Sequence, residues 1–197
     1  MVAMFTRPRV RPYEAPADEL PRTVRELFDA LPPLPGLRVE VIEGNLHVSP
    51  MGTPRHQALA MRLARLLQPV QDKHDWEAYV GVDICIEGPR DTFVPDYALA
   101  PKDCPLWGNE LRSTGVVMVA EIVSPGSVTD DYDVKPPLYA MGGIPVCLVI
   151  DPIADTLTVH SDIVDDSYRT TVTQDLGTTV HLPEPVDYDL DTAELTE

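Results

Sequence analysis

The chain has 197 residues, of which 44% are hydrophobic, and a formal net charge of −17. This composition is typical of a folded chain with one domain-sized core and excludes a disordered protein. No apolar run approaches the roughly 20 residues that span a bilayer, and the basic N-terminus lacks the apolar core of a secretory signal. We therefore expect a cytoplasmic protein without a membrane partner.

The cysteine count argues against disulfide-bonded and zinc proteins, and the charge distribution argues against general attraction to nucleic acid. The three cysteines are widely separated in sequence, which argues against a disulfide framework or a zinc site. Residues 151–197 hold twelve acidic residues and a single basic one, Arg169. Such an acidic chain is repelled by nucleic acid at long range, although a locally basic cleft is still compatible with DNA binding.

The first third of the chain predicts a helix, a hairpin and a second helix. Residues 1–17 are rich in proline and arginine and are expected to be irregular, whereas residues 18–197 are expected to form a single domain. Apolar spacing predicts a helix within residues 17–32, and two alternating runs predict a hairpin over residues 37–50. Thr53 and Pro54 then match the start of a helix that continues to about residue 70.

The remaining elements predict a sheet. Residues 76–88, 93–101, 115–125 and 144–152 have the composition of strands, with a loop at 107–109 and a short helix within 133–143. Short strands follow over residues 155–183. We expect a mixed α/β fold: a single domain with a central mixed β-sheet, flanking helices and a C-terminal β meander.

Two acidic residues stand out within this sheet. Glu121 lies in an almost entirely apolar strand, where a carboxylate is costly to bury unless another group pairs with it. Asp96 follows Pro95 at the start of a strand that we expect to neighbour it, so both carboxylates would reach one cleft. Lys135 would enter the cleft from the following helix. Two carboxylates and a nearby cation are the groups that Mg²⁺-dependent phosphodiester cleavage requires.

These residues resemble a known family. The segments "VPD", "EIVSP" and "D…K…LYA…GIP…LVIDP" are similar to the Uma-type restriction endonucleases of the PD-(D/E)XK nuclease superfamily. The earlier segments "VEVIEGNLHVSP" and "TPRHQALAMRLARLL" also match, so the resemblance covers about residues 38–160. It implies the restriction-endonuclease-like fold, hydrolysis of DNA, and Mg²⁺ as cofactor with Mn²⁺ as an alternative.

The resemblance also implies roles for individual residues. Asp96 would be the metal-binding aspartate of the "PD" element, and Glu121 would be the second metal ligand. Glu40 matches an early acidic position and is a candidate further ligand. His56 matches a family position as well, and it is a candidate catalytic residue whose role is open.

The lysine departs from the usual superfamily pattern. The usual position, two residues after the second acid, is Val123 here, so the lysine role passes to Lys135. Pro136 and Pro137 follow directly, and a proline disfavours a helical conformation at the residue before it. The sequence therefore leaves open whether the Lys135 ammonium reaches the carboxylates.

Each candidate also has a purely structural interpretation. Asp96 would cap a turn, Glu121 would pair with a buried arginine, Lys135 and Glu40 would face solvent, and His56 would be a half-buried histidine. The acids that precede Lys135 are expected to form a solvated loop or helix cap: Asp130, Asp131 and Asp133.

Three arginines lie opposite the apolar stripe of the helix that begins at Thr53. They form either a solvated face or a strip that contacts phosphate: Arg55, Arg62 and Arg65. The function favoured by the sequence is a Mg²⁺-dependent endonuclease acting on DNA. The alternative is a catalytically inactive, nuclease-like binding or assembly protein. Nucleases that cut both strands commonly pair, so a homodimer is compatible with the first function.

Overall fold

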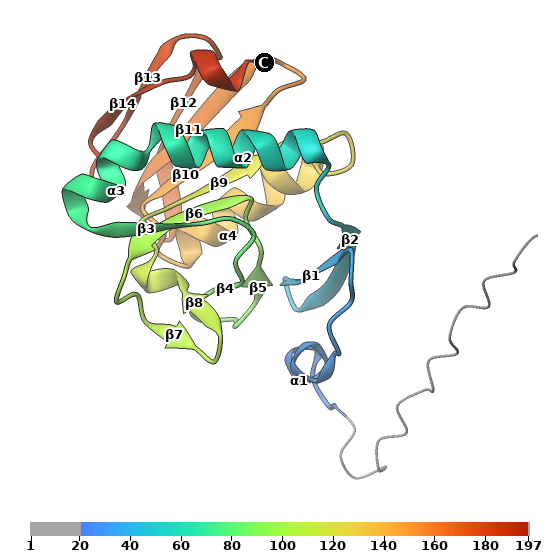
Figure 1. The fold of residues 1–197 in the computed structure, drawn as a ribbon. Helices are drawn as coiled ribbons and strands as arrows, with labels where there is room; N and C mark the ends of the chain where they lie inside the picture. Colours follow the sequence, from blue (N-terminus) through green and yellow to red (C-terminus); the bar gives the residue numbers. More distant parts are fainter. Residues whose placement is uncertain (1–20, 197) are drawn as a thin grey trace, which may run out of the picture.

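The computed structural model describes residues 21–196, which form helices at both faces of extended sheets (Figure 1). The helices are α1 (Val24–Ala30), α2 (Pro54–Leu66), α3 (Gln68–His74) and α4 (Lys135–Met141), with a π-helical turn η3 (Asp130–Val134) before α4 and 3₁₀ turns η2 (Ser113–Gly115) and η4 (Ala193–Leu195). The strands are β1 (Leu37–Ile42), β2 (Asn45–Pro50), β3 (Trp76–Tyr79), β4 (Ile84–Cys85), β5 (Thr92–Phe93), β6 (Tyr97–Pro101), β7 (Leu106–Trp107), β8 (Glu110–Arg112), β9 (Met118–Ile122), β10 (Val146–Asp151), β11 (Thr156–Val164), β12 (Ser167–Asp175), β13 (Thr179–Leu182) and β14 (Tyr188–Asp191).

The strands are divided between two mixed sheets and a separate hairpin. The first sheet has the order β2-β1-β5-β4-β8-β7, and the second has the order β12-β11-β10-β9-β6-β3. Strands β13 and β14 pair only with each other. The mixed α/β class is therefore confirmed, but the expectation of one central sheet is replaced by two six-stranded sheets.

The division arises where two expected strands are interrupted. Residues 76–88 contribute β3 to the second sheet and β4 to the first, and Gly81 between them has a φ of +63° that breaks the extended run. Residues 92–101 contribute β5 and β6 to different sheets in the same way. Pro95 lies between these two strands, and a proline cannot donate to a strand ladder.

Helix α2 covers one face of the second sheet, and α4 together with the first sheet covers the opposite face. Along β9, Met118, Ala120 and Ile122 join the core beneath α2, whereas Val119 joins a second core with α4 and the first sheet. Because side chains alternate along a strand, Glu121 shares the face of Val119 and points towards α4. The alternation thus directs this one carboxylate to the space between the two sheets.

Several local predictions are confirmed by backbone geometry. The β1–β2 hairpin turns at Glu43 and Gly44, whose φ values are +50° and +70°, as a type I′ turn requires. Helix α2 begins at Pro54, and the Thr53 side chain accepts a hydrogen bond from the His56 amide.

Other local predictions differ from the structure. The loop expected at residues 107–109 is the tip of the β7–β8 hairpin, in which Trp107 pairs with Glu110 and Gly108 has a φ of +61°. The expected C-terminal meander is divided, because β11 and β12 extend the second sheet while β13 and β14 form their own hairpin. The prediction for residues 1–17 lies outside the described residues. Within residues 21–196, no helix has the length and apolar character needed to cross a membrane.

The conformation of Lys135 is a further correction. Lys135 is helical, with φ −69° and ψ −43°, although Pro136 follows it. The two prolines occupy the first turn of α4, where missing amide donors cost little, and the preceding π-helical turn is closed by the Lys135 amide bonding to the Asp130 carbonyl. The proline pair therefore starts the helix instead of displacing the lysine.

Candidate active site

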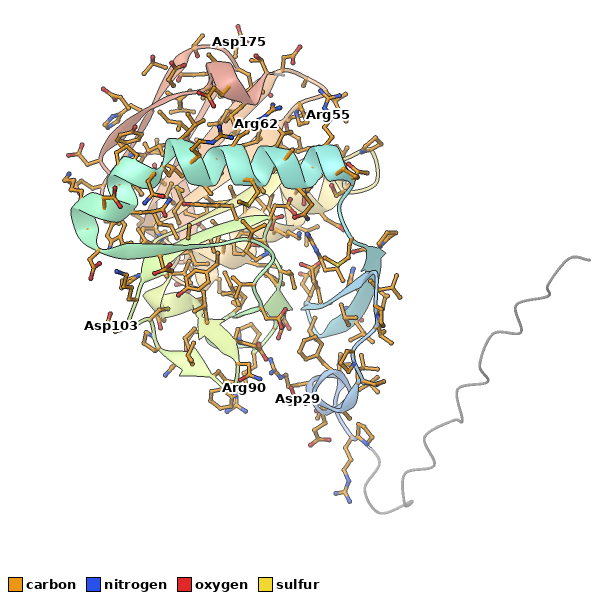
Figure 2. All side chains as sticks on the ribbon, in the orientation of Figure 1. Asp29, Arg55, Arg62, Arg90, Asp103 and Asp175 are labelled. Atoms are coloured by element: carbon orange, nitrogen blue, oxygen red, sulfur yellow. The ribbon has the colours of Figure 1, made fainter. Side chains whose placement is uncertain are left out.

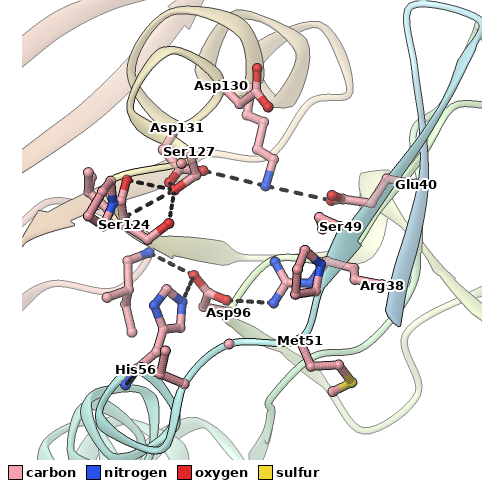
Figure 3. A pocket seen from close by; sticks show the side chains of 18 of the residues that line it. Arg38, Glu40, Ser49, Met51, His56, Asp96, Ser124, Ser127, Asp130 and Asp131 are labelled. Atoms are coloured by element: carbon pink, nitrogen blue, oxygen red, sulfur yellow. Dashed lines mark hydrogen bonds and ion pairs between the residues drawn. The ribbon is translucent and has the colours of Figure 1, made fainter. Parts of the chain in front are cut away.

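A cavity of about 730 Å³ opens between the first sheet, the N-terminus of α2 and the start of α4 (Figure 3). Its charged lining comes from distant parts of the sequence: Arg38, Glu40, Arg55, His56, Asp96, Asp130, Asp131 and Lys135. Glu121 is only 1% exposed and lies beside these residues without lining the cavity itself. The structure thus gathers all five predicted catalytic residues in one region.

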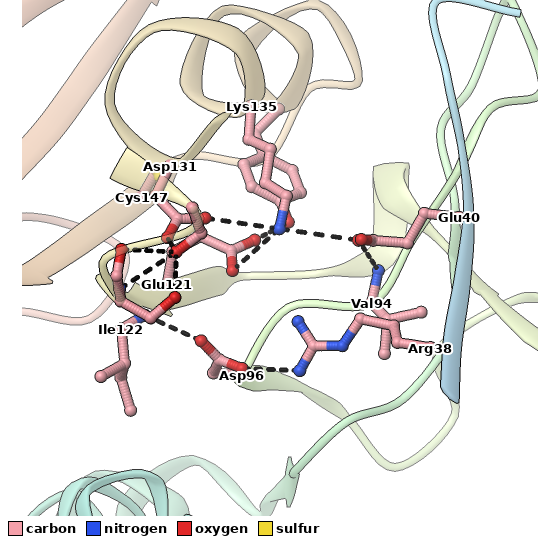
Figure 4. Close-up of polar contacts among 12 residues, drawn as sticks. Arg38, Glu40, Val94, Asp96, Glu121, Ile122, Asp131, Lys135 and Cys147 are labelled. Atoms are coloured by element: carbon pink, nitrogen blue, oxygen red, sulfur yellow. Dashed lines mark hydrogen bonds and ion pairs between the residues drawn. The ribbon is translucent and has the colours of Figure 1, made fainter. Parts of the chain in front are cut away.

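Asp96 lies at the centre of a hydrogen-bond network. Its Oδ1 accepts a hydrogen bond from Arg38 Nη2 at 2.7 Å, and its Oδ2 accepts one from the Ile122 amide at 2.8 Å (Figure 4). The same Oδ2 lies 2.7 Å from His56 Nε2 (Figure 3). Burial by itself would raise the pKa of Asp96, but the hydrogen bond from His56 and the charge of Arg38 outweigh it and lower the pKa to about 2. Asp96 is therefore a fixed, ionised carboxylate and not a simple turn cap.

Glu121 faces Asp96 across the two central strands. Strand β6 pairs with β9 so that Tyr97 is opposite Ala120, and continuing this register places Asp96 opposite Glu121. Glu121 Oε1 accepts a hydrogen bond from the Tyr139 hydroxyl, whereas Oε2 is buried and accepts no hydrogen bond. Burial, together with neighbouring carboxylates, raises the pKa of Glu121 to about 8.

Lys135 lies among three carboxylates. Its Nζ is 3.2 Å from Glu121 Oε2, 3.5 Å from Asp131 Oδ1 and 3.6 Å from Glu40 Oε1 (Figure 4). Burial would lower the pKa of Lys135, but Glu121, Glu40 and Asp131 outweigh it and hold the pKa above its usual value. The interpretation of Lys135 as a solvated side chain is therefore wrong, and the buried partner of Glu121 is this lysine and not an arginine.

Asp131 was not recognised as a site residue from the sequence. It is 2% exposed, so the expectation of a solvated loop fails for this acid. Asp131, Lys135 and Tyr139 are spaced four residues apart, and on a helix this spacing places them on one face. That face meets Glu121, so the spacing was a usable signal for both Asp131 and Tyr139.

The first hairpin supplies the other side of the site. Arg38 and Glu40 are two residues apart in β1 and therefore share one face of the strand. Glu40 is 6% exposed, and its Oε1 accepts a hydrogen bond from the Val94 amide at 2.9 Å, so it does not face solvent. Arg38, which was missed in the sequence, acts with His56 to keep Asp96 ionised.

His56 enters the site from the first turn of α2. A Cβ atom on Gly52 would lie 2.9 Å from His56 Cδ2, so the absence of a side chain at Gly52 leaves room for the imidazole. The imidazole Nε2 lies 2.7 Å from Asp96 Oδ2, so His56 contacts the carboxylate at the centre of the site.

The three arginines of α2 do not act as one strip. Arg55 lines the cavity, whereas Arg62 donates a hydrogen bond to the Glu194 carbonyl in η4 at 3.3 Å, and Arg65 is exposed (Figure 2). Of the predicted phosphate contacts, only Arg55 therefore lies at the cavity.

The charges at the site do not balance. Glu40, Asp96, Glu121 and Asp131 carry four negative charges when ionised, against two positive charges on Arg38 and Lys135. Within residues 21–196, no three His, Cys, Asp or Glu side chains are arranged as a metal cage. Mg²⁺ typically uses only one or two protein carboxylates and retains its waters, so the donor set suits that ion better than one that needs a full cage.

Comparisons with known proteins identify the fold and the family of this chain. A crystal structure described as that of a putative nuclease from Anabaena variabilis superposes with a TM-score of 0.67 at 20% identity, covering 89% of this chain and 98% of that chain. No curated protein matches the sequence. The model of the Uma2 family, described as "Putative restriction endonuclease", matches residues 25–194. The chain therefore belongs to the Uma2 family.

Proposed function

We propose that this protein is a metal-dependent endonuclease that hydrolyses phosphodiester bonds of DNA. The observation that carries the proposal is the convergence of Asp96, Glu121, Glu40 and Lys135 from separate elements between the two sheets. In the reaction, a water oxygen forms a new bond to phosphorus and one ester P–O bond breaks. The water proton is finally transferred to the leaving oxygen.

Asp96 and Glu121 are the residues that would hold Mg²⁺, or Mn²⁺ in its place. The fit rests on the excess of carboxylates over cations at the site and on Glu121 Oε2, which is buried and accepts no hydrogen bond. A bound divalent cation would neutralise charge that develops on the phosphate oxygens. Arg38 and His56 fix the Asp96 carboxylate, so its orientation does not depend on the cation.

Lys135 acts as a cation and hydrogen-bond donor in this proposal. Because three carboxylates keep its pKa above the usual value, the ammonium remains protonated at neutral pH and cannot accept a proton from water. It would orient the attacking water or stabilise charge on the phosphate. Arg55, which lines the cavity, would contact a backbone phosphate.

The test is a cleavage assay on plasmid and single-stranded DNA with Mg²⁺ or Mn²⁺. We expect Glu121→Gln to lose cleavage by about 100-fold or more, since it removes one proposed ligand charge while preserving the side-chain shape. Glu87→Gln, on an exposed side chain that pairs with Arg112, is the matched control and should cleave normally. Equal cleavage by wild type and Glu121→Gln would remove Glu121 from the mechanism.

A second candidate function is a nuclease-like protein that binds without cleaving. The observation in its favour is that Glu121 does not line the cavity and its Oε2 already faces the Lys135 ammonium. Mn²⁺ binding, followed by electron paramagnetic resonance, separates the two functions without an activity assay. Loss of Mn²⁺ binding in Asp96→Asn supports the nuclease, whereas no binding by wild type favours the second function.

A further inference from the structure

Strand β12 forms an open edge of the second sheet. Within residues 21–196 it pairs with β11 alone, in a register that runs from Thr156 opposite Asp175 to Val164 opposite Ser167. Every residue of β12 except Tyr168 is exposed, and Val172 is 46% exposed. The strand is thus nine residues long and uncovered on its outer edge and on most of both faces.

The sequence of β12 lacks the usual protections of an edge strand. Natural edges are blunted by lysine, proline, bulges or short length. The central segment Thr170–Gln174 reads Thr-Thr-Val-Thr-Gln, which contains no charge, proline or glycine and is rich in β-branched residues. Such a strand is a ready template for another strand.

The charges of β12 lie only at its two ends. Arg169 is the one basic residue among residues 151–197, although twelve acids surround it in the sequence. In the described part of the chain, neither Arg169 nor the Asp175 carboxylate takes part in an ion pair. The strand therefore presents one positive and one negative group that are both available to a partner.

We propose that β12 pairs antiparallel with β12 of a second copy of this chain, about a two-fold axis at Val172. In this register Arg169 lies opposite Asp175 of the partner subunit, and the symmetry repeats the pair at the other end. Thr171 lies opposite Thr173 of the partner subunit, a pairing that stabilises adjacent strands. The two second sheets would join into one continuous sheet of twelve strands.

The charges select this register over its neighbours. A shift that moves the axis by one residue places Arg169 opposite Thr173 or Gly177 of the partner subunit, and both ion pairs are lost. The acidic surface repels other approaches of two copies, so the single arginine sets the register as well as the attraction. Seven residues per copy, 169–175, give a small interface, so the dimer should depend on concentration.

Sedimentation velocity of the full chain over a range of concentrations tests the proposal. We expect wild type to shift from monomer to dimer, and both Arg169→Asp and Asp175→Arg to raise the dissociation constant at least 10-fold. The double variant with both changes restores opposite charges at each pair, so we expect it to dimerise close to the wild-type level.

Asp103→Arg is the matched control, because it makes the same charge change on an exposed residue that Figure 2 places far from Asp175. Thermal melts should show that all variants remain folded. A wild type that is monomeric throughout overturns the proposal. A dimer that is insensitive to both single changes, or a double variant that fails to recover, also overturns it.

Discussion

Two groups of buried or partly buried charged residues connect separate elements of this protein. They differ in the ratio of carboxylates to cations. At one end of the first sheet, Arg25 forms a two-pronged pair with Glu110, and Thr92 also donates to Glu110 at 2.9 Å. Between the sheets, four carboxylates share two cations. Arg25 also pairs with the exposed Asp29 at 2.9 Å, so the charge balance holds for its buried contact with Glu110. That contact holds α1 to the first sheet, whereas the excess of carboxylates in the unbalanced cluster between the sheets would favour a further cation. Local charge balance therefore separates a structural contact from a candidate active site.

The largest expected effect comes from removing the cation at the centre of the unbalanced cluster. Lys135→Met leaves Glu40, Glu121 and Asp131 without their shared ammonium, and breaking a buried pair in this way costs about 3–5 kcal/mol. Urea denaturation measures the loss. Lys102→Met, in an exposed pair with Asp75, should change the free energy of unfolding by less than about 0.5 kcal/mol. Similar losses in both variants would mean that the cluster is not buried in solution.

Changing the Arg25–Glu110 contact should lower stability and leave cleavage intact, whereas changing Glu121 should do the reverse. Glu110→Gln removes the charge that faces Arg25, and we expect a loss of about 2–3 kcal/mol in unfolding free energy with cleavage retained per folded molecule. Glu121→Gln should lose cleavage with a smaller loss of stability, because it relieves repulsion among the carboxylates. Urea titration and the plasmid assay, applied to both variants, check this. A reversed pattern would break the distinction between the two clusters.

A divalent cation should stabilise the folded protein by binding at the carboxylates between the sheets, and not at the Arg25–Glu110 contact. At a concentration of 100 times its Kd, Mg²⁺ that binds only the folded state adds about 2.7 kcal/mol to the unfolding free energy. We expect the melting temperature of wild type and Glu110→Gln to rise with Mg²⁺, and that of Asp96→Asn to remain unchanged. Calorimetric melts with and without Mg²⁺ provide the measurement, and an equal rise in Asp96→Asn would place the cation elsewhere.

The smallest effect concerns the packing that holds His56 against Asp96. Gly52→Ala places a methyl group 2.9 Å from His56 Cδ2, and we expect a loss of about 1 kcal/mol in stability together with a several-fold loss of cleavage. Gly126→Ala, beside the same cavity but with open space around it, is the control that should change neither quantity. Equal behaviour of the two variants would show that the imidazole moves freely.

Much of this arrangement was determined by the sequence alone. The hairpin at residues 37–50, the start of α2 at Thr53–Pro54 and the central strand containing Glu121 follow from turn chemistry, capping and apolar runs. These are local or periodic properties, so neighbouring residues suffice to predict them. The sequence pattern itself pointed to Asp96, Glu121 and Lys135, and the family resemblance added Glu40 and His56 to them.

The tertiary structure alone decided which of these groups meet and how their charges balance. Arg38 and Asp96 are separated by 58 residues, and nothing local to either residue predicts their 2.7 Å contact. The strands near Gly81 and Pro95 part into two sheets, and this division creates the cavity between them. Long-range strand pairing sets the distances among charged groups. The excess of carboxylates over cations at one point is therefore a property of the fold.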